Sequence, residues 1–126
     1  MARSKPRNAD LPTTTAARQA LLRSKKRGVV RTATDWEKLL ESPGNPLAGV
    51  PKKAVARFTK TLVFKRNGLG HANYGEIQDN LTYRQFSALW GAFGLSMSLF
   101  EDYKDYYCKA TGTCSKSITD ICTSNC

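Results

Sequence analysis

One periodic segment constrains the fold of this 126-residue chain more than any other feature. Residues 82–85 read Thr-Tyr-Arg-Gln, a capping-box pattern in which a hydroxyl and a glutamine side chain satisfy the first backbone groups of a helix. Large apolar residues then follow at helical spacing: Phe86, Leu89, Trp90 and Phe93. Because positions three and four apart share a helix face, the segment predicts a helix that buries one side in a core.

A second helix is predicted directly after the first. Gly94 ends the first helix, Ser96 is a suitable N-cap, and an aromatic stripe continues through Tyr107 to Cys108. Two helices joined at a glycine form a helical hairpin, which also resembles a helix-turn-helix corner. The acidic residues of the second helix would face phosphates in a DNA reader, so we interpret the hairpin as a packing element.

Capping and breaker residues predict three more helices, over residues 16–27, over residues 34–41 and from Pro51 onward. The glycine-rich segment 68–75 is predicted to be a loop, since glycine is suited to tight turns. The aromatic residues expected at the centre of the core are Trp36, Phe58, Phe86, Trp90, Phe93 and Phe100.

The predicted fold is therefore mainly α, and the length suits one domain. We expect a small single helical domain with a helical hairpin core (residues 33–107). A flexible basic N-terminal arm (residues 1–32) precedes it, and a Cys-rich, Ser/Thr-rich C-terminal tail (residues 108–126) follows it. Residues 86–100 carry no charge, but these 15 residues are fewer than the about 20 that a membrane-spanning helix needs.

Positive charge is concentrated at the front of the chain. Twenty Lys and Arg residues oppose ten Asp and Glu residues, a formal net charge of +10. Residues 1–32 hold nine of the bases with one acid, and residues 52–66 hold six bases with no acid. Clustered cations favour a polyanionic partner because they release condensed counterions when they meet phosphates. The alternative is a solvated basic face that serves solubility.

The helix predicted after Pro51 carries Lys53, Arg57 and Lys60 in one stripe opposite its apolar side. With the arm, this stripe predicts a non-enzymatic binding or assembly protein that contacts RNA, DNA or another polyanion, within a larger protein assembly. Phosphate contacts carry no base information, so the expected binding is independent of sequence. The predicted contact residues are Arg18, Arg23, Lys25, Lys26, Arg27, Arg31, Lys53, Arg57 and Lys60.

All four cysteines lie within residues 108–126, and they are Cys108, Cys114, Cys122 and Cys126. An even count in a segment too polar to bury a core of its own favours two disulfides, in any of three pairings. Zinc binding by four thiolates is a second chemistry, although the first spacing exceeds that of the usual zinc knuckle and fits poorly.

The tail also resembles the core segment of ribosomally synthesised, modified peptides. Its cysteines are interleaved with seven Ser and Thr residues, and in such peptides dehydrated Ser and Thr receive Cys thiols as thioethers. The resemblance implies an alternative function, a precursor whose Cys-crosslinked product is residues 108–126. The long basic segment ahead of the tail departs from the short acidic leaders usual in such precursors.

Catalysis has little support in the residues. The single histidine, His71, lies in the predicted loop, and a thiol nucleophile at Cys108 would need it as an adjacent base. Asp102 and Asp105 share a predicted helix face, but an acid–base pair needs a cleft that no pattern indicates. The Gly-x-Gly at residues 68–70 lacks the rest of a phosphate-binding motif. We therefore predict no enzyme activity, no cofactor and no bound metal.

The sequence does not assign the protein to one cellular compartment. The acid-poor first residues, rich in Arg, Ser, Thr and Ala, share their composition with organellar presequences. They lack the apolar run of a secretory signal peptide. Disulfides would nevertheless imply an oxidising environment.

Overall fold

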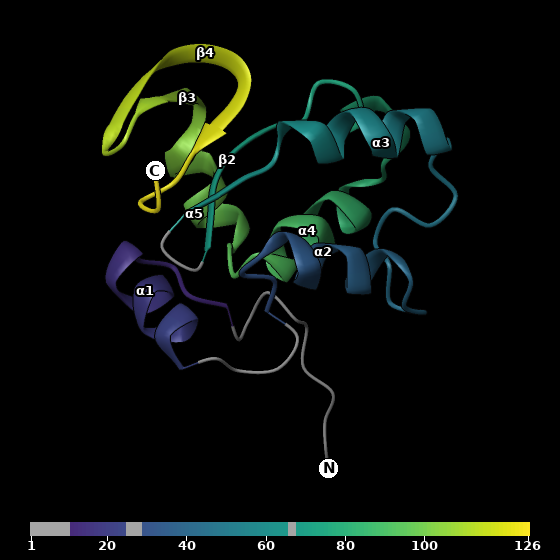
Figure 1. The fold of residues 1–126 in the computed structure, drawn as a ribbon, viewed down its shortest axis with the longest axis horizontal. Helices are drawn as coiled ribbons and strands as arrows, with labels where there is room; N and C mark the ends of the chain where they lie inside the picture. Colours follow the sequence, from purple (N-terminus) through teal and green to yellow (C-terminus); the bar gives the residue numbers. More distant parts are fainter. Residues whose placement is uncertain (1–10, 25–28, 66–67) are drawn as a thin grey trace.

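The structure, a computed structural model, describes residues 11–24, 29–65 and 68–126. Within these ranges the chain forms five α-helices, a short 3₁₀ helix and a four-stranded antiparallel sheet. The prediction of a mainly α fold built around a helical hairpin is therefore wrong, because a sheet shares the core with the helices. Figure 1 shows α2, α3 and α4 grouped on one side and the long β3–β4 hairpin on the other, with β2 between them.

The helices form close to where local signals predicted them. They are α1 (Thr15–Arg23), α2 (Ala33–Leu40), α3 (Lys52–Thr61), α4 (Tyr83–Ala92) and α5 (Met97–Tyr103), with the 3₁₀ helix η2 at Gln78–Asn80. The Thr82 capping box and the Ser96 N-cap are both present. Helix α2 begins one residue early because the Thr32 hydroxyl, and not that of Thr34, accepts from the backbone N–H of Asp35 (3.2 Å).

The strands are the part of the fold that was not predicted. They are β1 (Val63–Lys65), β2 (Gly68–Asn73), β3 (Lys104–Ala110) and β4 (Thr113–Cys122), in the spatial order β1-β2-β4-β3. Strand β2 occupies most of the segment expected to be a loop. Strands β3 and β4 replace the last turns of the second predicted helix and most of the tail, and a turn with Gly112 at φ 77° joins them.

Two physical causes account for this difference. The glycines of β2 allow close approach of the chain and do not form a turn, since a Cβ on Gly70 would lie 3.0 Å from the backbone oxygen of Asn125. The Gly70 carbonyl accepts from the backbone N–H of Thr123 (2.9 Å), which holds the C-terminal turn against the strand. In β3 and β4, aromatic and β-branched residues favour the extended backbone.

The core lies where the aromatic residues predicted it. Trp36, Phe58, Trp90, Phe93 and Phe100 are all at most 3% exposed, and Phe86 is partly buried against them. Trp90 stacks on Phe100 with ring centroids 5.1 Å apart. The sheet adds Leu69 and Ala72 from β2 and Ile121 from β4, all fully buried. Helices and sheet therefore share one core, and β4 is an integral part of it.

Candidate functional site

Helix α3 presents three of the six predicted contact residues that the structure describes. The apolar and the basic residues of this helix lie on two different faces. Ala54 and Phe58 are buried against the core, while four cations are exposed on the other side. We call these four residues the α3 cationic face: Lys52, Lys53, Arg57 and Lys60. The helix carries no acidic residue, so nothing within it neutralises this face.

The amino end of α3 is also short of negative charge. Pro51 is the N-cap and provides no side-chain hydrogen bond, and the first turn contains Lys52 and Lys53 with no acid. Cations at this end oppose the helix dipole, an effect of about 0.3–1 kcal/mol each at an exposed site. The free backbone N–H groups and both ammonium groups would therefore interact favourably with an anion placed there.

Only one member of the α3 cationic face forms an ion pair among the described residues. Arg57 Nη1 lies 3.4 Å from Glu76 Oε1, and both side chains are more than half exposed. Exposed pairs of this kind contribute about 0–1 kcal/mol. A phosphate could therefore replace Glu76 at little cost, and the whole face is available to a polyanion.

Arg18 has a different role from the one predicted. Its side chain is fully buried between α1 and the rest of the body. Its guanidinium donates to Asn125 Oδ1 (2.5 Å) and to the backbone oxygens of Leu69 (3.3 Å) and Phe93 (3.3 and 3.4 Å). Burial lowers the pKa of Arg18 to about 10, with a small opposing effect from Tyr103. The residue stays protonated at neutral pH and is not accessible to an external phosphate.

The other predicted contact residues do not extend the α3 cationic face. Arg23 is exposed at the end of α1, which lies at the opposite side of the molecule from α3 (Figure 1). Arg31 is half-buried, and its backbone N–H donates to Asp35 Oδ2 (3.0 Å). Lys25, Lys26 and Arg27 lie outside the described residues.

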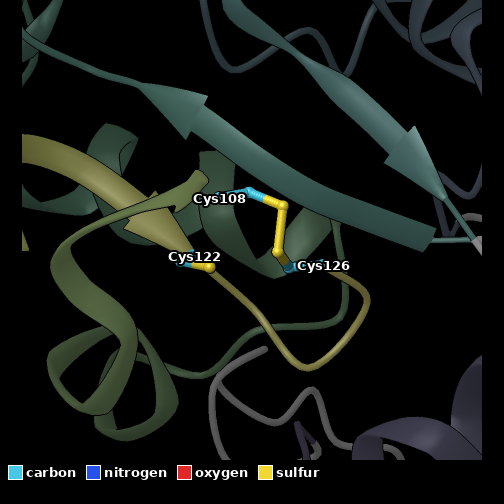
Figure 2. Close-up of side chains that lie close together, drawn as sticks. All are labelled: Cys108, Cys122 and Cys126. Atoms are coloured by element: carbon cyan, nitrogen blue, oxygen red, sulfur yellow. A yellow bond between two sulfur atoms is a disulfide. The ribbon is translucent and has the colours of Figure 1, made fainter. Parts of the chain in front are cut away.

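The cysteines form the second group of predicted site residues, and they are paired. Cys108 is bonded to Cys126, and Cys114 is bonded to Cys122. The prediction of two disulfides is confirmed, and the structure selects one of the three pairings. Figure 2 shows the Cys108–Cys126 bond with the sulfur of Cys122 beside it. The first bond ties β3 to the C-terminal turn, and the second ties the two ends of β4 together.

A cavity of about 450 Å³ lies against these disulfides. Three cysteines line it, Cys114, Cys122 and Cys126, together with the aromatic side chains of Tyr103 and Tyr106. The cavity therefore borders both disulfides, although Cys122 and Cys126 are themselves only 3% and 2% exposed.

A polar network between β2 and β4 was not predicted. Asp120 accepts from His71 Nε2 (2.9 Å) and Asn73 Nδ2 (3.0 Å) at one oxygen, and from the Ser117 hydroxyl (2.5 Å) at the other. The carboxylate thus lies between the hydroxyl and the imidazole. In a catalytic triad the imidazole occupies that position and removes the hydroxyl proton. This network orders the sheet and does not activate Ser117 as a nucleophile.

The catalytic pairs considered from sequence are also not assembled. Cys108 is in a disulfide, so it offers no thiol to His71, which is hydrogen-bonded to Asp120. Helix α5 ends at Tyr103, so Asp102 and Asp105 do not share a helix face. The His71 network could not be found from sequence, because it depends on the register in which Asn73 pairs with Asp120 across two distant strands.

No known protein family, curated protein or solved structure matches this chain. In the three described ranges, no helix combines the length and the apolar character needed to cross a lipid bilayer.

Proposed function

We propose that this protein is a non-enzymatic binding protein that contacts nucleic acid through the α3 cationic face and its basic N-terminal residues. One observation carries the proposal. Over ten residues, α3 exposes four cations and no acid, and its N-cap residue provides no side-chain hydrogen bond. A face selected only for solubility would more often mix both signs of charge.

The dimensions of the face suit a phosphate backbone. Lys53 and Lys60, with Arg57 between them, are separated by a rise of about 10 Å along the helix at 1.5 Å per residue. One nucleic-acid strand carries a phosphate about every 3.4 Å of duplex axis, so roughly three phosphates match this length. The guanidinium of Arg57 can hold a phosphate through two hydrogen bonds, whereas the lysines act as point charges.

Such contacts favour affinity over sequence recognition. Lysine and arginine contacts to phosphates fix a protein on the backbone without reading base edges. The basic residues among positions 1–10 (Arg3, Lys5 and Arg7) add charge of the same kind. The expected partner is RNA or DNA bound independently of its sequence, within a larger assembly of protein and nucleic acid.

The alternative, a crosslinked peptide product cut from residues 108–126, gains no support from the arrangement of the chain. That segment contributes β4 and the last three residues of β3, and it places Ile121 in the core. Removing it would expose β2 and unfold the sheet, so we do not develop this function further.

Fluorescence anisotropy with labelled single-stranded RNA and a DNA duplex of arbitrary sequence tests the proposal. The test variant carries Lys53→Gln, Arg57→Gln and Lys60→Gln. We expect it to bind at least about tenfold more weakly than the parent chain at low salt, because three phosphate contacts are lost. The weakening should be equal for unrelated sequences.

A matched control removes the same charge elsewhere. Lys38, Arg84 and Lys109 are exposed on three other elements, and their substitution by Gln also lowers the net charge by three. The control should retain affinity within about threefold, since only the long-range field changes. Equal weakening by both triple variants would refute the assignment of the α3 cationic face. Binding of heparin but not of either nucleic acid would refute the choice of partner.

A further inference from the structure

The two disulfides lie side by side in the fold. The sulfur atoms of Cys108, Cys122 and Cys126 all lie within 4.8 Å of one another. The sulfur of Cys114 is not within this limit of all three, but it is bonded to that of Cys122 and so lies next to the group. Figure 2 shows how Cys122 approaches the Cys108–Cys126 bond. We call these four atoms the sulfur cluster.

We propose that the sulfur cluster becomes a four-thiolate site for a soft divalent cation, zinc foremost, when both disulfides are reduced. Each disulfide takes two electrons and two protons from a dithiol reductant, which leaves as its own disulfide, and two cysteine thiols result. Binding of one Zn²⁺ then displaces the four thiol protons, because the thiolate is the form that coordinates metal.

The spacing of the sulfurs fits this coordination. Tetrahedral zinc holds each thiolate at about 2.3 Å, which places the sulfur atoms of a four-cysteine site roughly 3.8 Å apart. Non-bonded sulfurs of the cluster are at most 4.8 Å apart in the group Cys108, Cys122 and Cys126. They need to approach by about 1 Å, while the bonded partners separate by about 1.8 Å, from an ordinary bond length of about 2.0 Å, once the S–S bonds are broken.

Backbone pairing holds the cysteines in place without the disulfides. Cys108 and Cys114 are direct partners across β3 and β4, and Cys122 is paired with His71 of β2. The last turn is fixed separately, since the Thr123 hydroxyl donates to the backbone oxygen of Leu69 (2.5 Å) and the Cys126 N–H donates to the Thr123 carbonyl (3.1 Å). Reduction therefore frees the sulfurs but leaves their scaffold hydrogen-bonded.

The surroundings favour thiolates and allow an ion to enter. Lys65 Nζ lies 4.0 Å from the sulfur of Cys108, and a nearby ammonium stabilises the anionic thiolate. The cavity lined by Cys114, Cys122 and Cys126 provides a path for the ion from solvent. The spacing of the cysteines along the chain gave a poor match to a zinc knuckle, but the fold brings together ligands that no local motif contains.

Metal titration of the reduced full-length chain tests this proposal. The chain is reduced with a phosphine under anaerobic conditions, and Zn²⁺ is titrated in competition with a chromophoric chelator. We expect one equivalent of Zn²⁺ per chain, and we expect Co²⁺ in its place to give thiolate charge-transfer absorption with tetrahedral ligand-field bands. Cys122→Ser should weaken zinc binding by at least ~100-fold, since even outer-shell changes cost 10–100-fold.

Two controls accompany the titration. The oxidised chain, with its sulfurs locked in disulfides, should bind no equivalent of zinc. Thr113→Ser, a mild change beside Cys114, should bind zinc as the parent does. If reduction unfolds part of the chain, circular dichroism with and without Zn²⁺ still tests the proposal. Binding of zinc at the sulfur cluster should then restore the β-strand signal of the reduced chain. A reduced chain that neither competes with the chelator nor gains structure with zinc overturns the proposal, as does full affinity in Cys122→Ser.

Discussion

Substitution of Arg18 tests how the N-terminal helix is attached to the fold. The guanidinium joins three acceptors from distant parts of the chain, namely the backbone oxygens of Leu69 and Phe93 and the side chain of Asn125. In Arg18→Ala, Leu69 keeps the hydroxyl donor of Thr123, and Asn125 keeps a donor from Gln19. The Phe93 carbonyl loses its Arg18 donor.

The magnitude follows from these contacts. An unsatisfied buried carbonyl costs about 1–3 kcal/mol, and loss of the two buried methylenes Cγ and Cδ costs about 1.6 kcal/mol more. Relief from burying a charged group offsets part of this sum, since burial already lowers the pKa of Arg18 to about 10. We expect Arg18→Ala to lower the free energy of unfolding by about 3 kcal/mol. Arg18→Met, which keeps the apolar stem, should cost roughly half as much.

Urea denaturation followed by tryptophan fluorescence measures this change as a shift in the midpoint at constant slope. Arg23→Ala is the matched control, because Arg23 lies on the same helix and is exposed, and its substitution should change stability by less than about 0.5 kcal/mol. Equal effects of the Arg18 and Arg23 substitutions would refute the role of the buried guanidinium in docking α1.

Two further predictions concern the sheet and its surroundings. Gly70→Ala should lower the free energy of unfolding by about 1–3 kcal/mol in the same assay, because its Cβ would meet the Asn125 backbone at 3.0 Å. Gly44→Ala, whose Cβ would have its nearest neighbour at 3.9 Å, should leave stability unchanged. Equal stability of both variants would contradict this prediction. Burial, aided by nearby carboxylates, raises the pKa of Tyr74 above its ordinary value of 10.0, so the unfolded chain releases this proton at lower pH than the folded chain. The free energy of unfolding should therefore fall as pH rises through 10, and it should fall less in Tyr74→Phe. If urea titrations show the same decline in the parent chain and in Tyr74→Phe, Tyr74 is not the cause.

The elements that sequence predicted are those specified by local interactions. The capping box at Thr82 and the N-cap at Ser96 act within four residues, so they mark helix starts regardless of the rest of the fold. The aromatic periodicity of α4 likewise identified the side of the helix that packs in the core. The start points of these helices are therefore set locally, although their stability comes mostly from packing against the core.

The central pairing of the sheet, between β2 and β4, escaped prediction because it is not local. Strand β2 pairs with residues 120–122, almost fifty positions further along the chain. Its glycines suggested a loop, and only the closeness of Asn125 explains why a strand needs them. The pairing of the cysteines was equally inaccessible, since spacing leaves three pairings possible. Even the β3–β4 register does not give the answer, because Cys108 and Cys114 are direct partners across the strands but are bonded to Cys126 and Cys122.

Arg18 shows the same limit for the candidate site. In sequence it is one of nine cations in a basic segment, and it was assigned to the surface with the others. Its burial results from acceptors contributed by β2, the α4–α5 connection and the C-terminal turn, which come together only in the folded chain. By contrast, Lys53, Arg57 and Lys60 are placed by the period of a single helix, which is why sequence could assign them to one face.

The salt dependence of nucleic-acid binding tests the central claim most directly. The slope of log Kobs against log salt concentration counts the phosphates that a protein neutralises, at about 0.9 per contact for duplex DNA. The account predicts a steep negative slope for the parent chain, reduced in magnitude by roughly 2–3 in the Lys53→Gln, Arg57→Gln, Lys60→Gln variant. A slope that is the same in the variant and the parent would show that nucleic acid does not bind at the α3 cationic face.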